Sequence, residues 1–219
     1  MGRRALPKID PTLDLSRHLL EAEHLPPQLD QIALFGRVGP LEIEVGSGKG
    51  LFLAGAAKAH PERDFLGIEL AYKYARFAAA RLARQEFPNA RMICGDALAL
   101  FAAWVPSQSL SAVHVYFPDP WWKKKHRRRR VMNAPFLRDI ERTLVAGGTL
   151  HFWTDVEEYF QSTLELIARA TTLAGPLAVG ERAAEHDLDY HTHFERRMRL
   201  HDLPVYRSEF RKPVVSGEW

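Results

Sequence analysis

The sequence predicts an α/β fold: a mostly parallel sheet of seven strands, with helices on both faces and an antiparallel strand at one edge. From residue 41 onward, short apolar runs alternate with longer stretches of helical periodicity, which is typical of βαβ units. Glycines and prolines mark the junctions between these stretches. With 219 residues and 46% hydrophobic content, the chain is long enough to bury one sizeable core.

The first half of the pattern contains the clearest βα units. A glycine-rich turn at 46–50 separates the first strand from its helix, and prolines at 61 and 88 end the first two helices. The expected elements in this half are a strand at 41–45, a helix at 51–59, a strand at 65–69, a helix at 71–86 and a short strand at 91–94.

The second half continues the alternation and then weakens. Asp155 is expected to cap the last long helix, and the glycine pair at 147–148 to end the one before it. Residues 1–35 are expected to form an arm or short helices, and residues 36–219 a single domain. The expected elements are a helix at 97–104, a strand at 112–117, a helix from Asn133, a strand at 149–154, a helix at 156–172, and an antiparallel strand pair drawn from 176–182 and 196–211.

A basic run dominates the charge distribution. Formal net charge is +3, yet residues 123–130 contain seven basic residues and no acid, so the remainder of the chain is mildly acidic. Such a run attracts phosphate and makes binding salt dependent, which favours a nucleic-acid partner. A nuclear targeting signal or a heparin-like patch would leave the same signature.

The rest of the composition bears on the cellular compartment and on metal binding. A single cysteine, Cys94, allows no intramolecular disulfide and favours a reducing cytoplasm. The longest apolar run, 51–57, is too short to span a bilayer, and no apolar stretch follows the charged N-terminus. His186, His191 and His193 lack thiolate partners or a second helix-spaced pair, so no metal site is expected.

Acidic residues stand at the ends of four successive expected strands. Ligands of open α/β sheets bind outside the carboxyl ends of the strands, so these side chains are the candidates for ligand binding. Glycines in the first turn let the backbone approach a ligand closely. The candidate residues are Glu44, Gly46, Gly48, Glu69, Asp96, Ala97 and Asp119.

The spacing and charge of these residues favour a cationic nucleoside ligand. Leu51 follows Gly50, so the glycines read Gly-x-Gly-x-Gly and lack the dinucleotide spacing. Glu69 could bind the ribose of a nicotinamide or an adenosyl ligand alike. A ring of carboxylates, however, suits S-adenosylmethionine, which carries a sulfonium and an ammonium group but no phosphate. Asp96 would then face the adenine amine.

Several motifs together resemble the bacterial tRNA (guanine-N7-)-methyltransferase family. They are Glu-Val-Gly-Ser-Gly-Lys-Gly at 44–50, Phe-Pro-Asp-Pro-Trp at 117–121 with its basic continuation, Thr154-Asp155, and Thr-His-Phe-Glu at 192–195. The resemblance runs from about residue 41 to the end and implies a Rossmann-like class I methyltransferase fold. It also implies that S-adenosylmethionine is the cofactor, tRNA the partner, and the variable-loop guanine at tRNA position 46 the usual target.

The resemblance also assigns roles to residues. It implies that Glu44, Glu69, Asp96 and Asp119 line the cofactor pocket, and that Asp119 is the catalytic residue. The residues expected to contact tRNA are Lys123, Asp155, Thr192, His193, Phe194 and Glu195, together with Arg127, Arg128, Arg129 and Arg130 of the basic run. A monomer and a homodimer both remain compatible with the sequence.

The chemistry of guanine N7 restricts what these residues must do. N7 bears an in-plane lone pair and no proton, so in-line methyl transfer needs no general base, and Asp119 is expected to position groups or stabilise charge. A carboxylate, Asp155 or Glu195, would read the two donors of the guanine edge. Phe117, Trp121 or Phe194 would stack on the base.

Three other functions are compatible with parts of the sequence. They are a non-catalytic RNA-binding protein with a relic nucleoside pocket, a methyltransferase acting on another RNA or a small molecule, and a nicotinamide oxidoreductase. The complete set of acids disfavours the first of these, the basic run and the 192–195 motif disfavour the second, and the glycine spacing disfavours the third.

Overall fold

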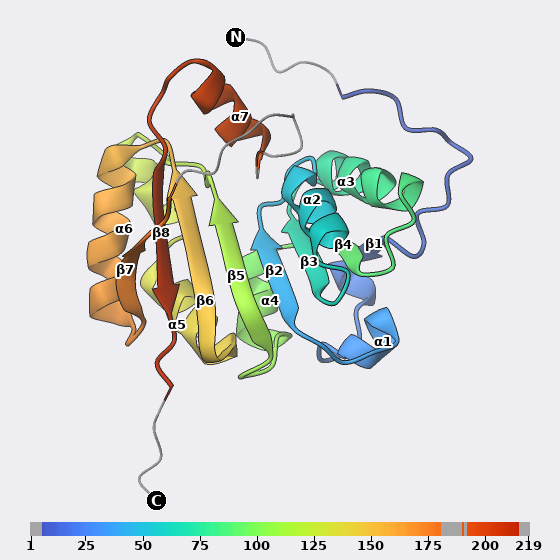
Figure 1. Ribbon diagram of the computed structural model, residues 1–219, viewed down its shortest axis with the longest axis horizontal. Helices are drawn as coiled ribbons and strands as arrows, with labels where there is room; N and C mark the ends of the chain where they lie inside the picture. The colour runs from blue at the N-terminus through green and yellow to red at the C-terminus, as the bar shows by residue number, and fades with distance from the viewer. Residues whose placement is uncertain (1–5, 181–189, 191, 215–219) are drawn as a thin grey trace, which may run out of the picture.

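A mixed eight-stranded sheet forms the centre of the molecule (Figure 1). The computed structural model describes residues 6–180, 190 and 192–214. Within them the strand order is β1-β4-β3-β2-β5-β6-β8-β7. The strands are β1 (Leu19–Glu21), β2 (Leu41–Val45), β3 (Asp64–Glu69), β4 (Ala90–Cys94), β5 (Leu110–Tyr116), β6 (Leu144–Thr154), β7 (Ala174–Ala178) and β8 (Tyr206–Arg211).

The direction of the strands confirms the predicted fold class. The first six strands along the chain run parallel to one another, whereas β8 is antiparallel to both β6 and β7. The sheet has one strand more than the seven expected, because Leu19–Glu21 pairs with β4 at the sheet edge. This strand lies within the 35 residues assigned to an arm or short helices; the division into an arm and a domain stays a prediction.

Helices cover the two faces of the sheet unequally. In Figure 1, α2 and α3 lie in front of the sheet, and α4 lies behind it. The core behind the sheet joins α4, α5 and α6 to the strands, while a smaller core in front joins α2 and α3 to β3 and β4. The helices are α1 (Gln31–Phe35), α2 (Leu51–Ala59), α3 (Tyr72–Arg84), α4 (Ala97–Ala103), α5 (Ala134–Thr143), α6 (Glu157–Ala170) and α7 (His193–Leu200), with short 3₁₀ turns η1 (Ala22–His24) and η2 (Lys124–Arg129).

Close packing of α2 against α3 depends on Gly50. This residue begins α2 in a left-handed conformation, with φ of 66°. A Cβ added to it would lie 2.7 Å from the Cβ of Ala78 on α3. Only glycine combines this backbone conformation with so close a contact without strain, so Gly50 lets α2 start directly against α3.

Four local predictions are corrected by the structure. The helix after Asn133 ends at Thr143, and β6 begins at Leu144, because the glycine pair lies at a bulge between β5 and β6. Asp155 does not cap α6: the N-cap is Val156, without a side-chain bond, and its N–H donates to Thr154 Oγ1. The first part of 196–211 is helical, in α7, and only Tyr206–Arg211 is a strand. Phe117 lies past the end of β5 rather than inside it.

Candidate functional site

The carboxyl ends of the parallel strands meet at one edge of the sheet. The strand order reverses at β2, which lies between β3 and β5, so a crevice is expected there. The four predicted carboxylates, Glu44, Glu69, Asp96 and Asp119, stand at or just after the ends of β2, β3, β4 and β5. The topology therefore brings them to the same edge.

Glu69 fixes the glycine turn that follows β2. Its Oε2 accepts a hydrogen bond from the N–H of Gly48 at 2.9 Å, and its Oε1 accepts one from the N–H of Ala71 at 2.9 Å. Gly46 and Gly48 have φ angles of 78° and 53°. A Cβ at Gly46 would meet no described atom within 4 Å, so the turn leaves open space above it. One carboxylate thus joins this turn to the start of α3.

Glu44 is a buried carboxylate with an unsatisfied oxygen. Only 3% of the residue is exposed, and its Oε2 accepts no hydrogen bond from any residue that the structure describes. Burial raises the pKa of Glu44 to about 8; the charge of Glu69 adds to this rise, and hydrogen bonding by Ser47 opposes it. A buried acid in this state would be stabilised in its ionised form by a nearby cation.

Asp96 and Ala97 lie at the start of α4. Asp96 is exposed, and its Oδ1 accepts a hydrogen bond from the N–H of Leu98 at 2.9 Å, so it is the N-cap of the helix. Ala97 is the first helical residue and is buried. The cap holds the connection after β4 in place at the edge of the crevice.

Asp119 is exposed within a turn that has two unusual backbone conformations. Phe117 and Trp121, on either side of Pro118-Asp119-Pro120, have φ angles of 49° and 46°, which non-glycine residues adopt rarely. The N–H of Phe117 bonds to the carbonyl of Trp153 at 2.8 Å and ties the turn to β6. Strained backbone of this kind persists where the surroundings enforce it, often at functional sites.

The basic run divides into anchored and exposed arginines. Arg130 Nε donates to the carbonyl of Pro120 at 2.8 Å, and its guanidinium lies 4.4 Å from the ring centroid of Tyr159. Arg127 pairs with Glu158 at 2.6 Å. Lys123, Arg128 and Arg129 are exposed, although Arg129 also lies 5.1 Å from the Trp121 ring centroid.

The Thr-His-Phe-Glu motif forms the start of α7. Thr192 is its N-cap, and Thr192 Oγ1 accepts a hydrogen bond from the N–H of Glu195 at 3.0 Å. Glu195 is buried and pairs with Arg207 at 3.3 Å and with Arg199 at 3.6 Å. His193 belongs to α7, but its side chain lies outside the described part of the structure, as do His186 and His191.

Phe194 brings α7 over the end of β5. Its ring is 43% exposed and stacks on Phe117, with centroids 5.6 Å apart and planes at 27°. The guanidinium of Arg197 lies 4.4 Å from the centroid of Phe194. Two of the three aromatic rings predicted to stack on the base therefore lie against each other, beside Asp119.

A hollow of about 550 Å³ lies next to α7 at the same edge of the sheet. Its lining includes Arg207, whose guanidinium also lies 5.1 Å from the ring centroid of Trp153 on β6. Asp155 follows β6 directly and is half-buried. The remaining lining residues are Tyr190, Arg199, Asp202, Leu203, Pro204 and Val205.

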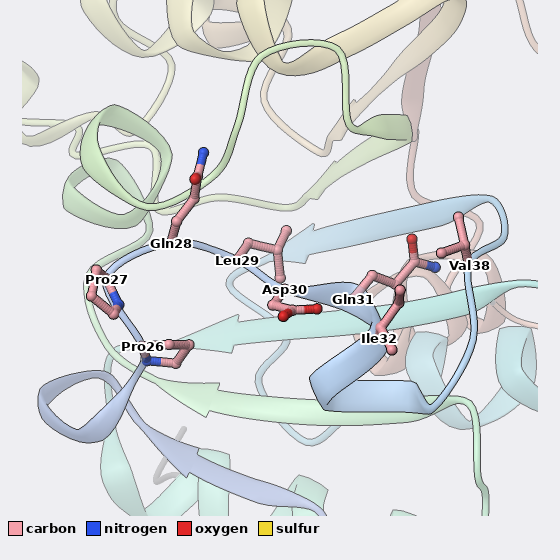
Figure 2. Close-up of a pocket in the computed structure, with 8 residues that line it drawn as sticks. All are labelled: Pro26, Pro27, Gln28, Leu29, Asp30, Gln31, Ile32 and Val38. Atoms are coloured by element: carbon pink, nitrogen blue, oxygen red, sulfur yellow. The ribbon is translucent and has the colours of Figure 1, made fainter.

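A second hollow, of about 540 Å³, lies away from the carboxylates. Figure 2 shows it beside α1, lined by residues 26–32 and Val38. α1 precedes β2 and lies near the amino ends of the strands in Figure 1. This hollow therefore does not contribute to the site at the carboxyl edge.

A buried polar network on the front of the sheet was missed by sequence reasoning. His114 on β5 bonds to Glu42 Oε2 at 2.8 Å and to the Tyr116 hydroxyl at 2.9 Å, and it stacks on His151 at 4.6 Å. Burial would raise the pKa of Glu42, but bonds and charges from His114 and Arg63 outweigh it and lower this pKa to about 2. Polar residues alternating with apolar ones in β2 and β5 were the available signal.

Two further observations concern membrane and metal. None of the helices in the described part of the chain is long and apolar enough to cross a membrane. Within residues 6–180, 190 and 192–214, no group of three or more His, Cys, Asp or Glu side chains is placed to hold a metal ion.

The sheet order, with carboxylates at the strand ends on either side of its switch point, is that of a class I methyltransferase fold. Solved structures agree: the aminoglycoside resistance methyltransferase NpmB1 superposes with a TM-score of 0.53 at 18% identity, over 80% of this chain and 88% of that one. The 30S ribosomal A1408 methyltransferase from an uncultured bacterium gives 0.52 at 15% identity, over 84% and 95%. These likenesses establish the fold.

Sequence comparisons establish the family. A family profile described as "Putative methyltransferase" matches residues 39–208. The chain is 52% identical to the tRNA (guanine-N(7)-)-methyltransferase of Rhodopirellula baltica over 97% of this chain and 80% of that protein. It is 37% identical to the enzyme of that name from Sodalis glossinidius, over 85% and 78%. The chain belongs to the tRNA (guanine-N7-)-methyltransferase family.

Proposed function

We propose that this protein transfers a methyl group from S-adenosylmethionine to N7 of guanine in tRNA, with the variable-loop guanine at position 46 as its target. The observation that carries the proposal is a juxtaposition: carboxylates at the strand ends and the basic run come together on either side of Asp119, at one edge of the sheet. Family membership supports the same reaction. Because tRNA is the substrate, the cytoplasm is the proposed site of action.

The residues of the crevice fit a cationic cofactor. Glu44 offers a buried oxygen without a described partner, and the turn at Gly46 leaves open space in which a ligand could approach the backbone. Glu69 keeps lone pairs beyond the two that bind N–H groups, and these can accept ribose hydroxyls. When bound, S-adenosylmethionine supplies the methyl group from its sulfonium.

Asp119 acts by position and charge in this proposal. Guanine N7 has no proton to remove, so the carboxylate serves to orient groups in the crevice and to stabilise positive charge on the base. Its turn holds it at the end of β5, between the crevice and the basic run. In this proposal Asp119 therefore faces both the cofactor and the substrate base.

The substrate base is proposed to enter between the turn and α7. Phe194 is the exposed member of the Phe117–Phe194 stack, and guanine would take the place of the Arg197 guanidinium over its ring. Asp155 is the candidate for the guanine edge, since Glu195 is buried in ion pairs with Arg207 and Arg199. Lys123, Arg128 and Arg129 are the candidates for backbone phosphates.

Nucleoside analysis tests this function. Purified protein would be incubated with unmodified tRNA and labelled S-adenosylmethionine, and the tRNA would then be digested and its nucleosides separated. We expect labelled 7-methylguanosine, a rate reduced at least about 100-fold by Asp119→Ala, and a normal rate for Glu165→Gln, which removes an exposed carboxylate from α6. RNA binding without any 7-methylguanosine would favour the non-catalytic alternative, and another labelled nucleoside would show a different target.

A further inference from the structure

We propose that α3 carries a second tRNA-binding surface, on the opposite side of the crevice from the basic run. The α3 surface consists of Leu70, Tyr72, Lys73 and Arg76. The inference rests on the proposed function, because it takes tRNA as the substrate. It adds a set of contacts that neither the basic run nor the motifs at 117–121 and 192–195 contain.

The charge of α3 is the first support. The helix contains four basic residues, Lys73, Arg76, Arg81 and Arg84, and no acidic one. Lys73 and Arg76 are exposed and form no ion pair with any residue in the described part of the chain. Like charges at this spacing destabilise a free helix, and an anionic partner reverses that cost. A polyanion is therefore the partner that this surface fits.

Exposed apolar side chains beside these charges are the second support. Leu70 is 74% exposed and Tyr72 51% exposed, although both are large hydrophobic residues. Tyr72 and Arg76 are four residues apart on the helix, and Lys73 and Arg76 three apart, so the side chains lie on neighbouring positions. An aromatic ring for stacking beside cations for phosphate is the combination that binds unpaired nucleotides.

The position of α3 is the third support. Glu69 binds the N–H groups of both Gly48 and Ala71, so the start of α3 is joined directly to the wall of the crevice. α3 follows β3 and the basic run follows β5, and these strands flank β2. Neighbouring strands lie about 4.8 Å apart, so β3 and β5, which lead into the two charged segments, lie roughly 10 Å apart. Figure 1 shows α3 and α7 at the same edge of the sheet.

This arrangement indicates how a tRNA would lie. A nucleotide that reaches into the crevice has chain on both its 5′ and its 3′ side, and each side needs phosphate contacts to offset the cost of extruding the base. The basic run supplies such contacts on the β5 side. The α3 surface supplies them on the β3 side, so that the target base is held between two positively charged segments.

A charge-matched pair of variants tests the surface. Lys73→Ala/Arg76→Ala removes two charges from the α3 surface. Arg138→Ala/Arg169→Ala removes two exposed charges from α5 and α6, behind the sheet. Binding of unmodified tRNA would be measured across a salt series. Each phosphate contact adds about 0.7–0.9 to the slope of log affinity against log salt.

We expect the α3 variant to lower that slope by about 1.5 and to weaken binding roughly tenfold in low salt, with S-adenosylmethionine affinity unchanged. The matched control should keep the slope of the unmodified protein, and so should Lys73→Arg/Arg76→Lys, which preserves the charges. An α3 variant with the slope and affinity of the control would overturn the inference. An equal loss of cofactor affinity would overturn it too, because the residues would then act through the crevice.

The same samples separate this inference from the proposed function. If 7-methylguanosine forms but the α3 variant binds tRNA normally, the function stands and the α3 surface is wrong. If no 7-methylguanosine forms but the α3 variant loses salt-dependent RNA binding, the surface stands and the proposed reaction is wrong.

Discussion

The Nε atom of Arg130 donates a hydrogen bond to the carbonyl oxygen of Pro120, 2.8 Å away, and its guanidinium packs on Tyr159 at 4.4 Å. Pro120 follows Asp119 directly, so the last arginine of the basic run holds the turn that carries the catalytic candidate. The Tyr159 hydroxyl also accepts a hydrogen bond from the N–H of Met132, at 3.4 Å. Arg130 is therefore a positioning residue, linked through Tyr159 to α6.

Arg130→Ala is expected to lower kcat by about 10- to 100-fold. Without Arg130 the turn can move, and a displacement of Asp119 by about 1 Å is enough to slow the reaction by this much. The KM for tRNA should change much less. Arg128→Ala should behave oppositely, raising KM and lowering the salt dependence of binding, because Arg128 is exposed. Steady-state kinetics over a range of tRNA concentrations measures both constants.

Arg130→Lys sharpens this comparison. Lysine keeps the charge and one donor but cannot keep both the Nε bond and the planar stack on Tyr159. Arg130→Lys should therefore restore kcat only in part, with a KM for tRNA close to that of the unsubstituted protein. Full recovery of kcat with lysine would mean that Arg130 contributes charge alone.

Glu44 predicts a pH dependence of stability in the cofactor-free protein. Burial raises its pKa from an ordinary 4.5 to about 8, so the folded protein holds a proton that the unfolded chain releases over this interval. The stabilisation is complete below about pH 4.5 and is lost as the pH rises towards 8. Glutamine does not titrate, so Glu44→Gln lacks this pH-dependent loss of stability. Its free energy of unfolding should rise relative to the unsubstituted protein between about pH 5 and 8, by an amount on the order of a few kcal/mol.

Urea unfolding at several pH values measures this difference. Glu165→Gln, at an exposed carboxylate on α6, is the control and should show a constant difference at every pH. If Glu44→Gln also showed a constant difference, Glu44 would titrate alike in the folded and unfolded chains. Its proposed state as a buried protonated acid would then be wrong.

The buried ion pair of Glu195 makes a prediction that separates two roles. Glu195 and Arg207 expose only 4% and 9% of their side chains, and removing one partner of a buried pair leaves the other without its counter-charge. Glu195→Gln should therefore lower the free energy of unfolding by about 3 kcal/mol. If Glu195 instead read the guanine edge, the substitution would reduce methylation while leaving stability unchanged.

A double-mutant cycle with Arg207→Met checks that the loss comes from this pair. The combined variant should lose less free energy of unfolding than the two single variants lose together, because it leaves neither Glu195 nor Arg207 as an unpaired charge. Additive losses would show that Glu195 and Arg207 stabilise the protein independently.

The parallel sheet could be predicted from the sequence because each of its central strands has a local signal. Leu41–Val45 alternates apolar residues with glutamates, and Asp64–Glu69 has an apolar centre between two acids. Both segments are bounded by turns, and both are strands in the structure. Leu19–Glu21 has no such signal: three residues are too few to show a period, and the strand forms through pairing with Met92–Cys94, about 70 residues away in the chain.

The candidate site shows the same division between local and long-range information. The carboxylates of the site could be predicted from the sequence, because the ends of the predicted strands place them at one edge of the sheet. The role of Arg130 is not visible, because Tyr159, on which it packs, lies 29 positions further along the chain. Thr192 and Glu195 did carry an overlooked signal: Thr-x-x-Glu is the pattern of a helix capping box, and Thr192 caps α7.

Asp155 predicts how the enzyme would distinguish guanine from other bases. It follows β6 directly, at the edge that also carries Asp119, and it is half-buried. A carboxylate can accept from both the ring N–H and the exocyclic amine of guanine, and inosine lacks the amine. Replacing the target guanine by inosine should lower kcat/KM by about tenfold or more, because one acceptor is left unpaired.

In Asp155→Asn the amide offers a single acceptor, so the preference for guanine over inosine should shrink towards unity. Methylation of both tRNAs by the unsubstituted protein, Asp155→Asn and the control Glu165→Gln measures this ratio. An unchanged ratio in Asp155→Asn would assign the guanine edge to another residue, and equal methylation of both tRNAs by the unsubstituted protein would mean that the exocyclic amine is not read at all.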